Sequence, residues 1–431
     1  MSSVHTGAAG GADHEARTLE ALRRALADVP FYAKHAPDAR VDGALDATLR
    51  ALPLLTRAHM RSALPKAWAP AGRDVKAELS AGRIHVVETG TASDRVRILW
   101  EDGALRQRER DALLTHPAAR AAIEGGDYRD AILFVPERGT GSCGSGDPTY
   151  EDRLEGDRLH LNSRQDPTFW TELVMTRMLD ELAHHRTAGL VADPFYADVL
   201  ARHAAATSRR FDVTGFVALS RALTTTAHRA ALAQVFDPRR TFQVFGSRET
   251  GPLFVEGEDG LLHHTPFSTH VELLPAKVET PGADDVALIV VTSIDREVQP
   301  LVRYVTGDLA RVARSAEGDA TGVRPLAGVE GKLDDAIVRP DGAIVTPAAL
   351  DRALAAAGVG RFQLTQSSAT EAELEVVDGS ADDALAAASA LLTGITVRAR
   401  KAMALAVEPN GKLKLTRRRF DAPLLGAFGG Q

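Results

Sequence analysis

Apolar runs that suit buried strands alternate with helical segments through the first 250 residues of the chain. The run "AILFV" at 131–135 is one such strand, and "TFQVFG" at 241–246 is another. Residues 168–205 and 219–236, which lie between these strands, carry apolar side chains at helical spacing. These apolar positions include Leu173, Met178, Leu182 and Leu232. Strands that alternate with helices predict an α/β domain with a largely parallel sheet.

The pattern changes twice in the second half of the chain. After Gly251, short strands separated by turns predict a smaller β-rich subdomain. From about residue 334, a hairpin around Asp341-Gly342 is followed by a helix, a second hairpin and a helix over 381–403. This remainder is long enough to form a small separate α+β domain. We therefore predict an α/β fold with an N-terminal domain over 1–333 and a C-terminal domain over 334–431.

Composition excludes several classes of partner. The chain has 431 residues and a formal net charge of -7, so no overall basic field would attract nucleic acid or anionic lipid. The single cysteine, Cys143, excludes an internal disulfide and a cysteine-based zinc site. No run approaches the roughly 18 apolar residues of a membrane span, and the first residues do not resemble a signal peptide. We expect a cytoplasmic protein, and its oligomeric state stays open.

The segment "FGSRETG" at 245–251 places a hydroxyl, an arginine and a carboxylate where a buried strand ends. We expect turns at Gly246 and Gly251. Open α/β sheets bind ligands beyond the carboxyl ends of their strands. There Phe245 could cover a base, and Glu249 could hold a magnesium ion. The alternative is an ordinary strand-end turn with a solvated ion pair.

Three later segments carry similar signals. In "LVRYVTGDLARV", Asp308 could accept hydrogen bonds from two ribose hydroxyls, or could simply form a β-turn. In "GKLDDAIV", the acidic pair that includes Asp334 could mark a hinge or an ordinary linker. In "EPNGKLKLTRRRF", a turn presents Lys412, which could reach a phosphate or carboxylate. The alternative for this last segment is a solvated basic face.

The order of these four segments resembles that of the adenylate-forming superfamily, and within it the phenylacetate–CoA ligase-like branch. "FGSRETG" is similar to that branch's aromatic-Gly-x-x-Glu motif, and "PLVRYVTGDL" to its Pro-Leu-x-Arg-Tyr-x-Thr-Gly-Asp-Leu segment. "GKLDD" resembles its Gly-Arg-x-Asp-Asp hinge, and "NGKLKLTRRR" its Gly-Lys tail. The resemblance covers roughly residues 50 to 420. It implies a large N-terminal adenylation domain and a mobile C-terminal domain.

The resemblance also implies roles for individual residues around ATP. The residues beside the nucleotide would be Phe245 over adenine, Gly246, Ser247, and Thr250 near the α-phosphate. Glu249 would be the magnesium ligand, and Asp308 would bind the ribose hydroxyls. Asp334 would be the hinge about which the C-terminal domain rotates. Lys412 would bridge the carboxylate and the α-phosphate during adenylation.

Two departures from the family pattern stand out. Lys332 occupies a hinge position where the family has arginine, so the charge is kept but the planar fork is lost. The phosphate loop, within 86–99, lacks its second glycine and contains Asp94. The polar loop residues that it keeps are Thr89, Gly90, Thr91 and Ser93. An inward carboxylate would repel phosphate, so either Asp94 faces solvent and Arg95 compensates, or the loop has drifted.

Other residues carry weaker signals. Cys143 could accept an acyl group, although an incidental cysteine is the simpler interpretation. The adjacent pairs His184-His185 and His263-His264 lack metal-binding spacing, and we interpret them as structural or solvated. Candidates for the wall of the acid pocket are Phe216, Val217 and Leu219, which core packing explains equally well.

The resemblance implies an ATP- and Mg²⁺-dependent ligase. It would convert a small carboxylic acid, with an aromatic acid favoured, into an acyl-AMP with release of pyrophosphate. Transfer of the acyl group to CoA would follow. One alternative acceptor is an amine or other nitrogen nucleophile, and another is a carrier-protein thiol. A third hypothesis is a degenerate, non-catalytic homologue that binds a nucleotide or a partner, and the altered phosphate loop is its support.

Overall fold

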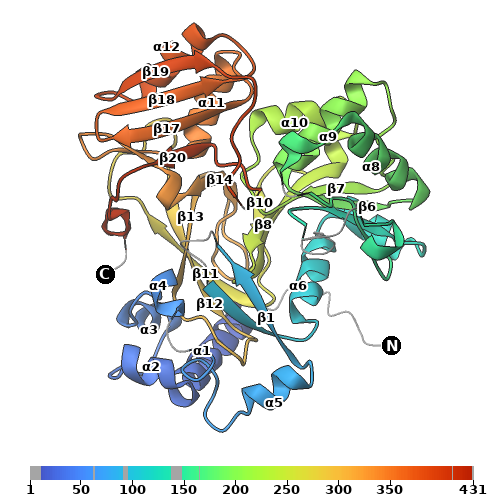
Figure 1. The fold of residues 1–431 in the computed structure, drawn as a ribbon. Helices are drawn as coiled ribbons and strands as arrows, with labels where there is room; N and C mark the ends of the chain where they lie inside the picture. The colour runs from blue at the N-terminus through green and yellow to red at the C-terminus, as the bar shows by residue number, and fades with distance from the viewer. Residues whose placement is uncertain are drawn as a thin grey trace.

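The computed structural model describes residues 11–61, 64–90, 96–136, 148–164, 166–409 and 411–429. One mixed sheet of twelve strands runs through the large lobe, and a smaller lobe formed by the C-terminal residues sits above it (Figure 1). The altered part of the phosphate loop, with Thr91, Ser93, Asp94 and Arg95, lies outside the described residues, as does Cys143.

The large sheet has a parallel half and an antiparallel half that meet at one strand, β8 (Thr241–Ser247). In sheet order, the first half is β4 (Leu154–Glu155), β5 (Arg158–His160), β3 (Asp130–Leu133), β6 (Gly189–Ala192), β7 (Phe216–Leu219) and β8. The second half continues with β9 (Gly251–Glu256), β10 (Leu262–His264), β14 (Leu326–Lys332), β13 (Tyr304–Val312), β12 (Val286–Ser293) and β11 (Thr269–Pro275). Strands β5, β3, β6, β7 and β8 are parallel, which confirms the predicted α/β class.

Helices cover both faces of the parallel half. On one face, α8 (Glu172–His184) and α9 (Pro194–Ala206) share a buried cluster with Leu190 of β6. On the other face, α6 (Ala104–Leu113) and α7 (Pro117–Glu124) pack against aromatic side chains of β7 and β8. A parallel sheet buried on both sides explains why its strands read as continuous apolar runs.

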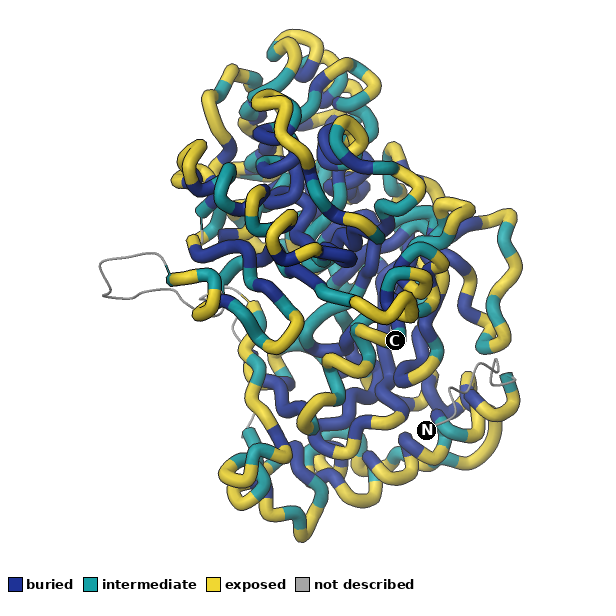
Figure 2. The backbone as a smooth tube through the Cα atoms, turned by 90° about the vertical axis from the view of Figure 1, so that its right-hand side faces the viewer, coloured by how far each residue is buried: buried dark blue, intermediate teal, exposed yellow. Residues whose placement is uncertain are grey.

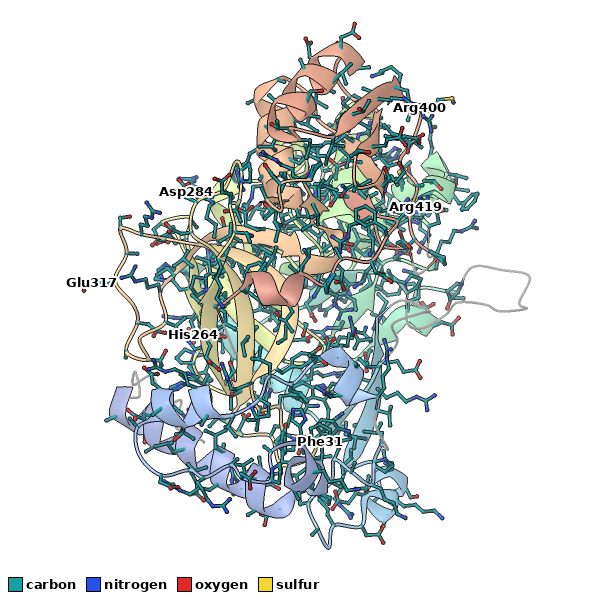
Figure 3. The ribbon with its side chains drawn as sticks, turned by 90° about the vertical axis from the view of Figure 1, so that its left-hand side faces the viewer. Phe31, His264, Asp284, Glu317, Arg400 and Arg419 are labelled. Atoms are coloured by element: carbon teal, nitrogen blue, oxygen red, sulfur yellow. The ribbon has the colours of Figure 1, made fainter. Side chains whose placement is uncertain are left out.

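The N-terminal residues form helices and a hairpin beside the antiparallel half. The elements are α1 (Gly11–Asp28), α2 (Pro30–His35), α3 (Leu45–Ala51), α4 (Arg57–Met60), α5 (Val75–Ser80), β1 (Ile84–Thr89) and β2 (Val96–Glu101). Strands β1 and β2 pair antiparallel, and they flank the predicted phosphate loop. Phe31, labelled in Figure 3, stacks on Trp68 with ring centroids 4.1 Å apart within this helical layer.

Several details differ from the sequence predictions. The interval 168–205 is not continuously helical, because β6 separates α8 from α9. Leu173, expected on a buried helical face, is 79% exposed, whereas Met178 and Leu182 are buried. The predicted helix over 381–403 ends at Leu391, and β19 (Thr396–Lys401) follows it. Gly394, with a φ of 83°, allows the chain to turn between these two elements.

The C-terminal lobe is a four-stranded sheet with two helices. Its sheet order is β19, β18 (Glu371–Val376), β17 (Phe362–Ser368) and β20 (Thr416–Arg418), and its helices are α11 (Pro347–Ala356) and α12 (Ala381–Leu391). The short strands β15 (Ile337–Val338) and β16 (Ile344–Val345) and the short helix η4 (Leu333–Asp335) join it to β14. Gly342, with a φ of 86°, lies in the turn of the predicted hairpin.

The two lobes share a hydrophobic core. Val286, Leu288 and Leu309 of the large sheet belong to the same buried cluster as Leu350 and Phe362 of the C-terminal lobe. The chain end adds a backbone connection, because the Gly429 N–H donates to the Pro275 carbonyl at 3.0 Å. Buried backbone continues from one lobe into the other (Figure 2). Any rotation of the C-terminal lobe therefore has to separate apolar side chains as well as bend a linker.

Gly246 lies inside β8 rather than at the predicted turn, which residues 248–250 form instead. The antiparallel partner strand passes very close to it. A Cβ atom at Gly246 would lie 2.3 Å from the carbonyl oxygen of Gly251 and 2.6 Å from the Cα atom of Pro252. The glycine is therefore required by the close approach of β9 and not by a turn conformation.

We predict that Gly246→Ala lowers the free energy of unfolding by roughly 2–4 kcal/mol, because backbone atoms must shift to admit the methyl group. Urea unfolding measures this change. Gly426→Ala is a matched control, since its added Cβ meets nothing within 4 Å. A Gly246→Ala protein as stable as this control would contradict the close strand approach.

Candidate functional site

The turn between β8 and β9 is held through its backbone. The three successive carbonyl groups of residues 248–250 each accept a hydrogen bond from a side chain. Trp100 Nε1 donates to the first at 2.9 Å, Arg296 Nη1 to the second at 2.7 Å, and Arg108 Nη1 to the third at 3.2 Å. A turn without regular backbone pairing is thus fixed in one conformation.

The three donors also contact one another. The Arg296 and Arg108 guanidinium groups lie 4.4 Å and 4.6 Å from the Trp100 ring centroid, at cation–π distance. Arg296 is fully enclosed, and this burial, together with the nearby charge of Arg108, lowers the pKa of Arg296 to about 9. Trp100 belongs to β2, so the hairpin that flanks the predicted phosphate loop is connected directly to the turn.

Ser247 and Thr250 shape this turn from within. The Ser247 hydroxyl oxygen accepts hydrogen bonds from the backbone N–H groups of Glu249 and Thr250, each at 3.2 Å. The Thr250 hydroxyl donates to the Gly251 carbonyl at 2.7 Å and is buried. Both hydroxyls therefore support the turn that presents Glu249.

The Glu249 side chain is only 7% exposed and faces a cation that the sequence prediction missed. Arg57 Nη2 donates to its Oε1 atom at 3.0 Å. Arg57 is the first residue of α4, and the preceding Thr56 is the N-terminal cap of that helix. Nothing in this local capping pattern indicates that the first side chain of the helix reaches Glu249.

The chemistry around Glu249 is compatible with a magnesium ion. Mg²⁺ is commonly bound by one or two protein carboxylates, with water and substrate phosphates as its other ligands. Within the described ranges, no cluster of three or more His, Cys, Asp or Glu side chains could hold a metal ion by itself. Glu249 could therefore supply one carboxylate ligand to such an ion.

Asp308 lies on strand β13 of the antiparallel half, and both it and Glu249 attract the charge of Lys332. It sits opposite Lys332 in the β13–β14 pairing, and Lys332 Nζ donates to its Oδ2 atom at 2.8 Å and to the Thr306 carbonyl at 3.2 Å. Desolvation opposes the charge on Lys332, but the carboxylates of Asp308 and Glu249 outweigh it and raise the pKa of Lys332. The predicted ribose-binding carboxylate and the hinge lysine are therefore direct partners.

Lys412 comes from the far end of the chain to the same region. Its pKa is lowered, first by desolvation and then by the positive charges of Lys332 and Arg221. The carboxylates of Asp193 and Glu249 act in the opposite direction. The residue itself remains exposed, so solvent moderates these effects. Lys412 and Glu249 thus lie within electrostatic reach of each other although 163 positions separate them in the sequence (412 minus 249).

Two further charged residues were not predicted, and each follows a strand of the parallel half. Asp193 caps α9 after β6, accepting a hydrogen bond from the Phe195 N–H at 2.9 Å. Burial raises the pKa of Asp193 to about 6, against the opposing effect of Lys412. Arg221 follows β7 with a φ of 71°, and its guanidinium lies 3.7 Å from the Phe134 ring centroid. Their positions after strand ends were the signal that could have found them.

The remaining predicted site residues lie as follows. Phe245 packs in the core of the antiparallel half, with its ring centroid 6.3 Å from that of Phe254. The expected pocket residues are fully buried and face opposite sides of the sheet: Phe216 packs with α7, whereas Val217 and Leu219 pack with α8 and α9. These three side chains do not converge on one pocket.

The structure describes the start of the predicted phosphate loop and the predicted hinge. Thr89 ends β1, and Gly90 follows it with a φ of 101°. Asp334 is exposed in the short helix η4, while the neighbouring Asp335 accepts a hydrogen bond from Lys414 Nζ at 2.7 Å. A hollow of about 670 Å³ adjoins this hinge. It is lined by acidic and basic side chains in equal number, so its charge does not single out an anionic or a cationic ligand.

The adjacent histidine pairs have structural partners. His185 shares a hydrogen bond of 2.8 Å with the Tyr150 hydroxyl. His264, where the N-terminal helices approach the antiparallel half (Figure 3), lies 3.3 Å from an Asp319 oxygen. His14 and His270 surround it, and burial is the main cause that lowers the pKa of both.

Comparison with known proteins identifies the fold. No family model and no curated protein sequence matches this chain. Solved structures do, among them 2-hydroxyisobutyryl-CoA ligase in the postadenylation state in complex with 2-HIB-AMP. Its TM-score is 0.66 at 14% identity, over 97% of this chain and 90% of that one. The same ligase in an open conformation with 2-HIB-AMP and CoA gives 0.54 at 15% identity, over 96% and 93%.

A third similar structure is the amide bond synthetase McbA from Marinactinospora thermotolerans. Its TM-score is 0.51 at 15% identity, over 76% of this chain and 66% of that one. The chain therefore has the fold of the adenylate-forming ligases, with a large N-terminal part and a smaller C-terminal part, as the sequence motifs predicted. None of the helices in the described residues has the length and apolar character that crossing a membrane requires.

We predict that Asp193→Asn stabilises the protein at neutral pH. The pKa of Asp193 in the folded state is about 6, above the ordinary value of 3.8. Folding therefore favours the protonated form, and this contribution to stability is present below pH 4 and lost as the pH rises through 6. Asparagine keeps the helix cap without the charge, so its free energy of unfolding at pH 7 should rise by on the order of 2 kcal/mol.

Urea unfolding at pH 7 and pH 4 tests this prediction, because the difference between the two proteins should disappear at pH 4. The control is Asp284→Asn, which alters an exposed loop carboxylate (Figure 3) and should show no such pH dependence. A constant difference between the Asp193→Asn protein and its parent at both pH values would contradict the prediction.

Proposed function

We propose that this protein is an adenylate-forming ligase that activates a carboxylic acid with ATP. A free carboxylate is a poor acyl donor, because its leaving group would be an oxide. Attack of a carboxylate oxygen on the α-phosphate forms an acyl-AMP and breaks the bond to pyrophosphate, which departs. AMP can then leave when an acceptor attacks the acyl carbon. The enzyme must mainly align these groups and supply positive charge.

The observation that supports this function is the convergence of Lys412, Lys332 and Arg57 around the buried carboxylate of Glu249. In the proposal, Lys412 contacts the substrate carboxylate and the α-phosphate as they approach each other. Glu249 would hold Mg²⁺, which would supply charge neutralisation at the phosphates. Asp308 keeps an oxygen that can accept a ribose hydroxyl while the other is bound to Lys332.

Thr250 and the ends of the phosphate loop would complete the nucleotide site. The firmly held turn keeps Thr250 next to Glu249, where we place the α-phosphate. Thr89 and Gly90 would lead the loop toward the other phosphates. The closer similarity to the postadenylation state of 2-hydroxyisobutyryl-CoA ligase than to its open conformation supports a C-terminal lobe arranged for adenylation.

We propose CoA as the acceptor, with a small carboxylic acid as the acyl source. An amine is the second candidate, because an amide bond synthetase shares this fold. A rotation about Asp334, which would withdraw Lys412, requires the core shared by Leu288 and Leu350 to open. If this opening is slow, acyl transfer rather than adenylation limits turnover.

Acid-dependent ATP–pyrophosphate exchange, measured over a broad panel of acids, tests adenylation. Lys412→Ala should reduce exchange by roughly 100- to 1000-fold, because charge stabilisation of the α-phosphate is lost. It should leave acyl transfer from a preformed acyl-AMP unchanged. Lys76→Ala, on the exposed face of α5, is the control. Equal loss of both steps in Lys412→Ala would contradict the assigned role, and no exchange by the folded parent would favour a non-catalytic protein.

The acceptor is identified separately by mass spectrometry of the products formed with CoA, with a panel of amines and with a phosphopantetheinylated carrier protein. An acyl-CoA that forms faster than any amide is expected. If an amide or an acyl-carrier product forms in preference to the acyl-CoA thioester, the acceptor is an amine or a carrier protein and not CoA. The adenylation proposal would remain intact.

A further inference from the structure

The turn that carries Lys412 is attached to the large lobe by a buried hydroxyl. Tyr196, in the first part of α9, is fully buried, and its hydroxyl donates a hydrogen bond of 2.9 Å to the Gly411 carbonyl. Gly411 immediately precedes Lys412 and has a φ of 77°, so the turn uses a backbone conformation that suits glycine. The hydrogen bond therefore fixes the peptide directly before the lysine.

Apolar side chains and backbone hydrogen bonds support the same turn. Val407 and Leu413 form a β-bridge on either side of it, and both pack against the buried cluster of α8 and α9. Within the turn, the Glu408 N–H donates to the Lys412 carbonyl at 2.8 Å. The described residues on both sides of this turn, Val407 and Leu413, are therefore docked onto the large lobe.

The same end of α9 supplies the carboxylate that attracts the lysine most strongly. Asp193, the capping residue of α9, is the largest source of the attraction that opposes the lowering of the Lys412 pKa. Burial raises the pKa of Tyr196, so its hydroxyl keeps its proton and remains a donor. The start of α9 thus binds the backbone of the turn through Tyr196. Its Asp193 carboxylate attracts the ammonium group of Lys412.

We propose that Tyr196 is a positioning residue for adenylation, which holds Lys412 at the reacting carboxylate and α-phosphate only while the C-terminal lobe is docked. This inference rests on the proposed function. Small displacements of an aligned group reduce rates strongly, and a buried carbonyl without its donor is unfavourable. The hydrogen bond must break when the lobe rotates, so Tyr196 should act in the adenylation step and not in acyl transfer.

Tyr196→Phe separates this role from simple packing. The phenylalanine ring keeps the contact with Trp170, whose ring centroid lies 5.4 Å from that of Tyr196, and only the hydroxyl is lost. We expect kcat for ATP–pyrophosphate exchange to fall roughly 10- to 100-fold, with transfer from a preformed acyl-AMP unchanged. The control is Tyr150→Phe, whose hydroxyl binds His185 in the same half of the sheet and should affect neither step.

A double variant provides the second readout. Because Tyr196 would act through Lys412, Tyr196→Phe should add no further loss of exchange to Lys412→Ala. Equal losses in both half-reactions, or a full additional loss in the double variant, would overturn the positioning role while the parent's exchange activity still supports the proposed function. Absence of exchange in the parent would overturn both.

Discussion

The turn between β8 and β9 depends on three side-chain donors that bind its three successive carbonyl groups. Trp100 and Arg108 lie on the consecutive elements β2 and α6, whereas Arg296 comes from a distant part of the chain. With its backbone fixed in this way, the turn can present the Glu249 side chain to Arg57. The site therefore rests on polar contacts that are themselves buried, where satisfied hydrogen bonds rigidify and an unsatisfied one is costly.

The twelve-stranded sheet explains how segments that are distant in the sequence come together at the candidate site. Its parallel half provides strand ends that carry Asp193 and Arg221, and its antiparallel half carries Asp308 opposite Lys332. Strand β8 belongs to both halves, so the turn that follows it lies where the two meet. The C-terminal lobe then adds Lys412 across a shared apolar core, which couples the position of the lysine to the docking of a whole lobe.

Short sequence motifs can suggest only those site residues that lie within the motifs themselves. Glu249, Asp308 and Lys412 could be proposed from the sequence because each belongs to a glycine-containing segment, and these segments follow one another in a recognisable order. Arg57 and Tyr196 were missed, since an arginine after a helix cap and a tyrosine in a helix acquire their partners only through tertiary contacts 192 and 215 positions away.

The fold class was predictable for a similar reason. Runs of apolar residues indicate buried strands, and helical spacing of apolar residues indicates helices. The predictions of the α/β class and of the C-terminal hairpins were therefore correct. Periodicity did not reveal that Leu173 faces solvent, nor that 396–401 pairs with β18, because a short segment rich in arginine is stabilised there by its neighbour strand. The sequence also did not reveal that the parallel and antiparallel halves form one sheet, because that pairing depends on tertiary contacts.

The central claim is that Glu249 and Lys412 converge on the phosphates of one bound nucleotide. A crystal structure of the protein with ATP and Mg²⁺ tests it most directly. We expect the metal on the Glu249 carboxylate, the α-phosphate within hydrogen-bond distance of the Lys412 ammonium, and the ribose hydroxyls at Asp308. A nucleotide bound elsewhere, with Glu249 still paired to Arg57 and no phosphate within reach of Lys412, would contradict the claim.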